Sequence, residues 1–150
     1  MGAGERAREA DVALAERLGE LIAREQWVLL TGGRDAGVMA AAVRGAKRVA
    51  GSLTVGILPA ESGPFAPGLD IPIFTGLGNA RNVINVLTSR VVITCGYLSP
   101  GVASEAAFAL KTKRPLILLA PDPDAEAFFG GAQIARSPEE AIELVRKIVG

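Results

Sequence analysis

The sequence contains no histidine and only one cysteine, Cys95. Zinc sites built from Cys and His, Ser-His-Asp triads and disulfide frameworks are therefore excluded. Its 16 Lys and Arg residues balance 16 Asp and Glu residues, so it lacks the basic surplus that non-specific nucleic-acid binding requires. No apolar run approaches the roughly 20 residues that span a bilayer, and the N-terminus has no signal-peptide pattern. We expect a cytoplasmic protein with no metal site that binds neither nucleic acid nor membrane.

The composition indicates one globular domain. The chain has 150 residues, of which 49% are hydrophobic and 21% charged, a size and balance typical of a single core-forming unit. Its 18 glycines and 5% aromatics suggest an α/β protein whose glycines lie in strand-to-helix turns. Because no linker, repeat or low-complexity tract divides the chain, we predict a single domain over residues 1–150.

Hydrophobic periodicity predicts alternating strands and helices. Short apolar runs predict strands at Trp27–Thr31, Leu53–Leu58, Ile71–Thr75, Val91–Cys95, Pro115–Leu119 and Ala132–Ala135. Helices are predicted at Glu5–Gln26, Val38–Val49, Asn79–Ser89, Ala103–Lys111 and, capped by Ser137, up to Val149. Pro72 indicates an edge strand, and residues 121–129 indicate a loop with one helical turn. This order predicts a Rossmann-like three-layer αβα sandwich with a mostly parallel sheet.

The beginning of the chain departs from this pattern. A doubly wound fold usually opens with a central strand that leads into a glycine turn, whereas this sequence opens with the turn itself, Gly2-Ala3-Gly4. A parallel sheet cannot leave its central position empty without losing ladder hydrogen bonds. We therefore expect that the first central strand is missing upstream of Met1, or that another segment takes its place.

Four glycine-containing turns are expected at the carboxyl ends of the strands, where ligands bind in open parallel sheets. They lie at residues 2–4, 32–37, 76–82 and 96–105. Each places glycines before a helix N-terminus, whose free N–H groups and dipole favour an anion. Together they predict a phosphorylated small-molecule ligand. The Walker signature and the dinucleotide fingerprint are absent, which disfavours an NTPase and an NAD enzyme.

Two charged residues, Arg81 and Glu105, are expected to face one pocket from the first turns of their helices. Arg81 would hold a phosphate and Glu105 a hydroxyl or water. The alternative is that Glu105 complements its helix dipole and Arg81 pairs with another carboxylate. Asn82 and Asn85 lie three residues apart on one helix and are both expected to reach the pocket, whereas Asn79 is expected to be an N-cap.

Several short stretches carry a family resemblance, namely Gly32-Gly33, Gly37-Val38-Met39, Ala42, Gly45-Ala46 and Val55-Gly56-Ile57-Leu58-Pro59. They resemble the signature of the lysine-decarboxylase-like (LOG-like) Rossmann superfamily, and the resemblance covers nearly the whole chain. The superfamily includes cytokinin-activating phosphoribohydrolases and molybdenum cofactor carrier proteins. A decarboxylase would need a Schiff-base lysine, but all four lysines fall within or after predicted helices, so no PLP is expected.

The details favour the carrier branch. The phosphoribohydrolases carry a Met-His-x-Arg-Lys stretch and a Pro-Gly-Gly-x-Gly-Thr-x-x-Glu loop. Arg81, Gly101 and Glu105 match these motifs, but Asn82 replaces the Lys, Val102 replaces the Thr, and the Pro-Gly-Gly triplet is absent. The resemblance therefore implies a non-enzymatic homo-oligomer, a dimer or tetramer, that shelters molybdenum cofactor (molybdopterin) at the edge of the sheet, with its phosphate on glycine-rich loops and helix N-termini.

Three hypotheses remain open from the sequence. The first is a molybdenum cofactor carrier. The second is a nucleoside 5′-monophosphate phosphoribohydrolase that cleaves the N-glycosidic bond with Arg81 and Glu105. The third is a nucleotide-sensing or structural module with a vestigial site. The predicted ligand-binding residues are Gly32, Gly33, Arg34, Gly37, Val38, Met39, Gly78, Arg81, Asn82, Asn85, Gly96, Ser99, Gly101, Ser104 and Glu105.

Overall fold

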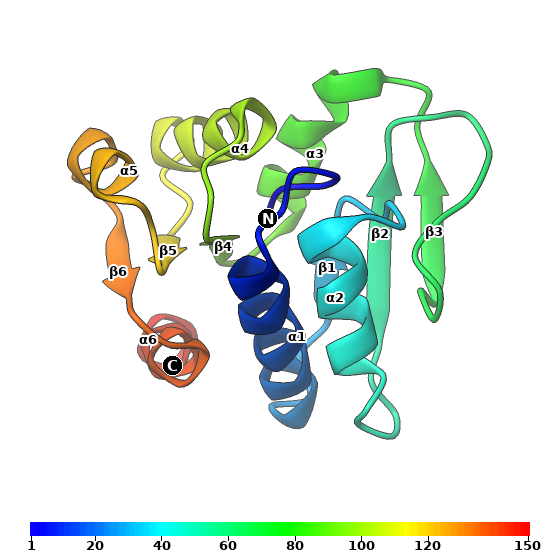
Figure 1. Cartoon of the computed structure of the whole chain (residues 1–150), viewed down its shortest axis with the longest axis horizontal. Helices are drawn as coiled ribbons and strands as arrows, with labels where there is room; N and C mark the ends of the chain where they lie inside the picture. The colour runs from blue at the N-terminus through cyan, green and yellow to red at the C-terminus, as the bar shows by residue number, and fades with distance from the viewer.

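The computed structural model describes residues 1–150 and has helices on both sides of parallel strands, as predicted (Figure 1). The strands are β1 (Leu29–Thr31), β2 (Thr54–Leu58), β3 (Ile71–Phe74), β4 (Val92–Cys95), β5 (Leu116–Leu119) and β6 (Gln133–Ala135). The helices are α1 (Glu9–Arg24), α2 (Gly37–Ala46), α3 (Asn82–Thr88), α4 (Pro100–Lys111), α5 (Pro123–Phe128) and α6 (Pro138–Val149), with a 3-10 turn, η1 (Gly78–Arg81), before α3.

Two helices, α1 and α4, begin at other residues than predicted. Both of these starts lie at the end of the molecule that carries the glycine turns. Helix α1 begins at Glu9 instead of Glu5, because the Ala7 N–H donates to the Gly4 carbonyl in a turn. Glu5 therefore belongs to a loop. Helix α4 begins at Pro100 with Ser99 as its N-cap, which moves Glu105 from the predicted first turn to the second.

One further correction concerns the segment around residue 79. The single helix predicted from Asn79 is divided into η1 and α3, and Leu77, not Asn79, is the N-cap of η1. The helical turn predicted within residues 121–129 is present as the short helix α5. The predicted cap of α6 is confirmed, because the Glu140 N–H donates to Ser137 Oγ at 3.2 Å.

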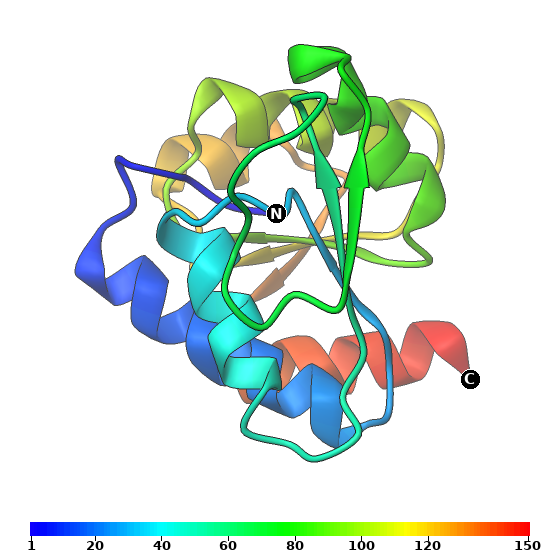
Figure 2. The ribbon, with the colours of Figure 1, turned by 90° about the vertical axis from the view of Figure 1, so that its right-hand side faces the viewer.

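The strands form two three-stranded parallel sheets, β1-β2-β3 and β4-β5-β6. Strand β3 pairs only with β2, so the edge position indicated by Pro72 is confirmed. Between the sheets, Gly2 forms a parallel bridge to Cys95 at the end of β4, and the N-terminal segment lies there in Figure 1. Strands β4–β6 run at a steep angle to β2 and β3 (Figure 2), as the accumulated twist of a parallel sheet predicts.

Alternation along β5 shows that helices cover both faces of the strands. Ile117 and Leu119 belong to one buried cluster, whereas Leu116 and Leu118 belong to another, and successive side chains of a strand point to opposite faces. Helices α1, α2 and α6 supply the first cluster, and α3 and α4 supply the second. The three-layer arrangement follows.

None of the helices combines the length and the apolar character that a membrane span requires.

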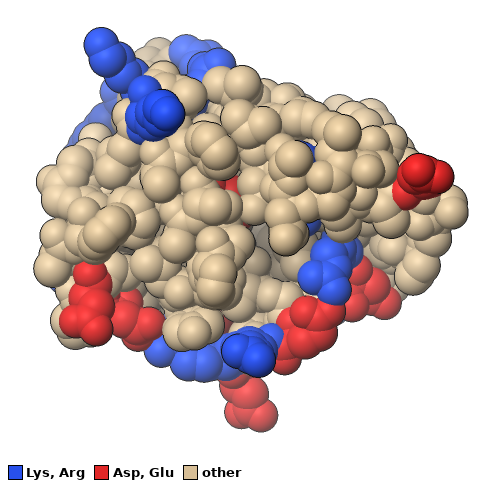
Figure 3. All heavy atoms as spheres, turned by 90° about the horizontal axis from the view of Figure 1, so that it is seen from above, with Lys and Arg blue, Asp and Glu red and all other residues tan.

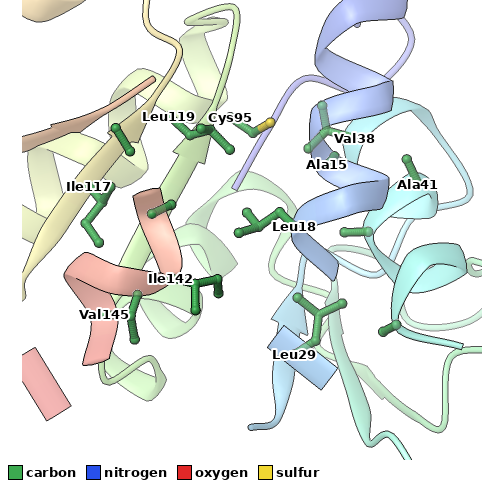
Figure 4. Close-up of a cluster of buried hydrophobic side chains, with 14 of the residues drawn as sticks. Ala15, Leu18, Leu29, Val38, Ala41, Cys95, Ile117, Leu119, Ile142 and Val145 are labelled. Atoms are coloured by element: carbon green, nitrogen blue, oxygen red, sulfur yellow. The ribbon is translucent and has the colours of Figure 1, made fainter. Parts of the chain in front are cut away.

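Helix α1 joins the two halves of the molecule. It packs against both α2 and α6, and Leu18 lies between the buried side chains of the two halves (Figure 4). The contact with α2 is close because α1 has a glycine there. A Cβ on Gly19 would lie 2.0 Å from the carbonyl oxygen of Ala42, which is far inside van der Waals contact.

We expect Gly19→Ala to lower the melting temperature by several degrees. Forcing the helices apart costs about 1–3 kcal/mol, and a clash with backbone places this site near the upper end, above the gain of up to about 1 kcal/mol from better helix propensity. Thermal unfolding followed by circular dichroism measures the change. Gly130→Ala is the control, because its Cβ would meet no atom within 4 Å. Equal melting temperatures for Gly19→Ala and the wild type would contradict this packing.

Candidate functional site

A polar pocket of about 310 Å³ lies where loops from four parts of the chain meet. Three of these loops follow the carboxyl ends of β1, β3 and β4, and the fourth is the N-terminal segment, residues 1–6. Ligands of open α/β sheets bind at this position. Figure 3 views the molecule from the side toward which β2 and β3 point, and charged side chains lie mainly around the periphery of that face.

Arg81 is a buried cation in the wall of this pocket and is only 8% exposed. Its Nε has no hydrogen-bond partner, and its Nη1 lies 3.8 Å from Glu105 Oε1, which is too far for a hydrogen bond. Burial lowers the pKa of Arg81, the charge of Glu105 opposes that shift, and repulsion from Arg34 adds to it. A buried donor without an acceptor is costly, so this guanidinium is suited to receive an anion.

Gly32 provides the space that this guanidinium occupies. A Cβ on Gly32 would lie 2.7 Å from Arg81 Nη2 and 2.8 Å from both Arg81 Nη1 and Met39 Sδ. The turn that carries Gly32 is held by Thr31, whose Oγ1 accepts a hydrogen bond from the Gly33 N–H at 3.0 Å. The absence of a side chain at position 32 therefore lets loop backbone lie directly against Arg81.

Glu105 is the second buried charged residue of the pocket and is 5% exposed. Asn85 Nδ2 donates a hydrogen bond to Glu105 Oε1 at 2.8 Å. Burial raises the pKa of Glu105, while the Met1 amino group, the Asn85 hydrogen bond and the charge of Arg81 oppose the shift. Asn85 was expected to reach the pocket but does not line it, because it is fully buried behind Glu105. Its side chain holds the Glu105 carboxyl in place.

Asn82 connects α3 to the N-terminus of α4. Its Nδ2 donates to Ser104 Oγ at 2.9 Å, and Ser104 Oγ donates to the Gly101 carbonyl at 2.7 Å. Ser99 Oγ accepts from the Val102 N–H at 3.5 Å and caps α4. The start of α4 is thereby fixed against the pocket, where its free N–H groups favour negative charge.

The charges around the pocket favour an anionic ligand. Three arginines, Arg6, Arg34 and Arg81, and two glutamates, Glu5 and Glu105, line it. Arg34 forms an ion pair with Glu5, and both side chains are exposed, so this pair contributes little to stability. No group of three or more His, Cys, Asp or Glu side chains suited to hold a metal ion is present.

The structure brings many of the predicted residues together at this pocket. Those that line it are Gly32, Arg34, Met39, Arg81, Asn82, Ser99, Gly101 and Glu105. Asn85 and Ser104 contact Glu105 and Asn82 of that set from behind, whereas Gly33 lies against Gly56 and Leu58. Gly37 and Val38 lie against the N-terminal loop, since the Val38 N–H donates to the Ala3 carbonyl at 3.0 Å.

The last two predicted residues, Gly78 and Gly96, also lie outside the lining of the pocket. A Cβ on Gly78 would meet no atom within 4 Å, and Gly96 lies against the Asp11 carboxylate. Both glycines have a positive φ, which accounts for their presence without a ligand. Cys95 is a buried core residue, and burial raises the pKa of its thiol to about 12.

The turn of residues 2–4 was predicted at this edge and does form part of one wall of the pocket, but Glu5 and Arg6 of the same wall, together with Asn79 and Val102, were not predicted to bind a ligand. The turn glycines Gly2 and Gly4 are the signal that points to this wall. The helix predicted from Glu5 concealed it, because Glu5 and Arg6 were assigned to regular structure. Asn79 was expected to cap a helix, but it makes no side-chain cap hydrogen bond.

We expect Glu105 to destabilise the folded protein increasingly as the pH rises above its ordinary pKa of 4.5. Because burial raises its pKa, the folded state holds this proton at a pH where the unfolded state has lost it, so stability falls as pH rises through that interval. Glu105→Gln cannot titrate and keeps an acceptor for Asn85. Melting temperatures measured from about pH 4 to 8 should favour the variant progressively toward higher pH. A difference that stays flat, or that comes to favour the wild type, would refute the raised pKa.

Three comparisons with known proteins agree with one another. The chain matches the family model described as the SLOG cluster4 family over residues 1–144. A curated relative, an uncharacterized protein of Archaeoglobus fulgidus, is 41% identical over 142 residues, which are 95% of this chain and 89% of the relative.

Two solved structures are similar to the chain over its whole length. The molybdenum cofactor binding protein of the phototrophic bacterium Rippkaea orientalis has a TM-score of 0.94 and 49% identity, covering 100% of this chain and 94% of that one. The molybdenum cofactor carrier protein of Chlamydomonas reinhardtii has a TM-score of 0.92 and 43% identity, covering 99% and 95%. The LOG-like resemblance and its carrier branch are thus confirmed, and the chain belongs to the SLOG cluster4 family.

Proposed function

We propose that this protein binds, protects and carries molybdenum cofactor in the polar pocket, with the cofactor's phosphate on Arg81. The observation that carries the proposal is the buried Arg81 Nε, which has no hydrogen-bond partner within the chain. A phosphate oxygen supplies the acceptor that this donor lacks. Relatives at 43–49% identity that bind or carry molybdenum cofactor support this choice of ligand.

The residues around Arg81 suit the rest of such a ligand. The pocket volume of about 310 Å³ lies at the lower end of the range for small-molecule sites. The start of α4, fixed by Ser99 and Asn82, adds backbone donors for phosphate oxygens. Glu105 offers an acceptor to ring N–H groups of a pterin. Carriage needs only these binding contacts, so no residue has to perform chemistry.

We expect Arg81→Gln to weaken binding of molybdenum cofactor by about 1.5–3 kcal/mol, or roughly 10- to 150-fold in Kd. Glutamine keeps a polar side chain but loses the charge and the donor fork. Cofactor released anaerobically from a molybdoenzyme can be mixed with each protein, and the pterin retained after desalting is measured as its fluorescent oxidation product. Arg136→Gln is the control, because Arg136 is exposed and pairs with Glu126 away from the pocket. Equal retention by Arg81→Gln and the wild type would remove Arg81 from the site.

A nucleoside 5′-monophosphate phosphoribohydrolase is the second candidate. It is favoured by one observation, that Arg81 and Glu105 are both buried and lie 3.8 Å apart in the same pocket. In that reaction Arg81 would grip the phosphate, and Glu105 would stabilise positive charge on the ribose or orient the attacking water. Burial raises the pKa of Glu105 and so disfavours the charged form of the carboxyl that the first of these roles requires.

Incubation with AMP separates the two candidates. A carrier forms no free adenine even at high protein concentration, and that is the result we expect from chromatography of the products. Adenine formed by the wild type and lost in both Arg81→Ala and Glu105→Ala would establish the hydrolase instead. Adenine formed equally by all three proteins would indicate a contaminating enzyme, and it would leave the hydrolase unsupported.

Self-association into a dimer or tetramer is a further part of the proposal. Phe128, Leu77 and Leu87 are 79%, 52% and 48% exposed, and contact with a second copy of the chain would remove such side chains from water. The cytoplasmic location and the lack of NAD or PLP stay predictions.

A further inference from the structure

Every arginine of the chain except Arg6 and Arg81 donates a side-chain hydrogen bond to an acceptor within the protein. The acceptors are carboxylates, except that Arg90 and Arg114 donate to backbone carbonyls. The two exceptions are far apart in the sequence, yet both line the polar pocket. The guanidinium groups that the protein leaves without a hydrogen-bond partner are thus gathered at one site.

The carboxylates of the pocket do not compensate the charge of Arg6. Glu5 is its neighbour in the sequence, but the Glu5 carboxylate forms an ion pair with Arg34. Glu105, the other glutamate of the pocket, lies 3.8 Å from Arg81. Arg6 forms an ion pair with neither of them, so its positive charge stays without a counter-charge in the pocket.

The two unpartnered arginines lie at different depths of the pocket. Arg81 is buried in its wall, whereas Arg6 is exposed on the N-terminal loop, at the mouth. Met39 lies between them, because a Cβ on Gly32, beside Arg81, would be 2.8 Å from Met39 Sδ, and a Cβ on Gly4 would be 3.6 Å from Met39 Cε. A ligand that contacts both cations therefore passes an uncharged thioether on the way.

We propose that Arg6 forms a second anion subsite at the mouth of the pocket, so that the ligand carries two anionic groups joined by an uncharged segment. The inference rests on the proposed function, in which Arg81 binds the first group, a phosphate. Arg6 binds the second group through charge-assisted hydrogen bonds. Molybdenum cofactor has this chemistry, because its metal-bearing end carries negative oxygen and sulfur ligands in addition to the phosphate. A ligand with two phosphates has it as well.

Arg34 is placed to assist Arg6 at this subsite. Its guanidinium lies along the N-terminal loop, because a Cβ on Gly4 would be 3.5 Å from Arg34 Nη1. The ion pair of Arg34 with Glu5 is exposed on both sides, and pairs of this kind contribute little to stability. Arg34 therefore exchanges Glu5 for an anion of the ligand at little cost.

The test compares probes that carry one anionic group with probes that carry two. The probes are propylphosphonate and a series of alkane diphosphonates of increasing spacer length, and their affinities are measured by NMR titration of the wild type, Arg6→Gln and Arg81→Gln. Arg136→Gln is the control with the same change in net charge, because Arg136 pairs with Glu126 away from the pocket. Arg6→Gln should fold as the wild type does, since the exposed Arg6 side chain has no hydrogen bond to lose.

The best diphosphonate should bind the wild type about fivefold more tightly than propylphosphonate, which is the upper end of the effect of one exposed ion pair. Arg6→Gln should lose most of this ratio, while its affinity for propylphosphonate changes less than about twofold. Arg136→Gln should keep the ratio. An equal ratio in the wild type and Arg6→Gln, or a ratio lost equally in Arg136→Gln, would overturn the subsite.

The same titrations separate this proposal from the proposed function. Arg81→Gln should weaken binding of propylphosphonate, and equal binding by Arg81→Gln and the wild type would overturn the phosphate site at Arg81 and not the subsite at Arg6. Retention of molybdenum cofactor by Arg6→Gln then identifies the second anionic group. Retention lowered about fivefold assigns that group to the metal-bearing end of the cofactor. Unchanged retention, with the diphosphonate ratio lost, assigns the subsite to a ligand with two phosphates.

Discussion

The buried guanidinium of Arg81, which lacks an acceptor for its Nε, is the constraint on which the candidate site depends. The absence of a side chain at Gly32 leaves space for this guanidinium, and Glu105, 3.8 Å away, provides a counter-charge without a hydrogen bond. Neither contact replaces the hydrogen bonds that the guanidinium would make in water. Asn85 holds Glu105 from behind. Because its side chain is neutral, it adds no charge that could balance Arg81. An anion would complete this arrangement, and the proposed phosphate would do so with several acceptor oxygens.

The fold presents this guanidinium through two halves that α1 joins. Arg81 and Glu105 come from the segments that follow β3 and β4, which belong to different sheets. The close contact of α1 with α2 at Gly19 and the packing of Leu18 between the halves hold the two sheets in a fixed position relative to each other. The N-terminal segment bridges them at Cys95 and closes one side of the pocket. The site therefore depends on contacts between the halves.

Much of this arrangement was predictable, because local patterns determine it. The apolar runs that end at Thr31 and Cys95, each followed by glycine, predicted the edge where the pocket lies, and Arg81 and Glu105 do meet there. Three-residue spacing could not show that Asn82 faces the pocket while Asn85 faces inward, because that depends on how α3 rotates against α4. The helical pattern of α1 was extended to Glu5 in the prediction, so Glu5 was placed in a helix instead of in the wall of the pocket. The division into two sheets depends on long-range pairing, which local patterns do not encode.

The most direct test of the proposed function is a crystal structure of the protein loaded with molybdenum cofactor. The cofactor should lie in the polar pocket, with a phosphate oxygen within hydrogen-bond distance of Arg81 Nε. The Gly32 backbone should remain against the guanidinium, as it is here. A cofactor bound elsewhere on the molecule, or one whose phosphate leaves Arg81 Nε without a partner, would contradict the assignment of this pocket.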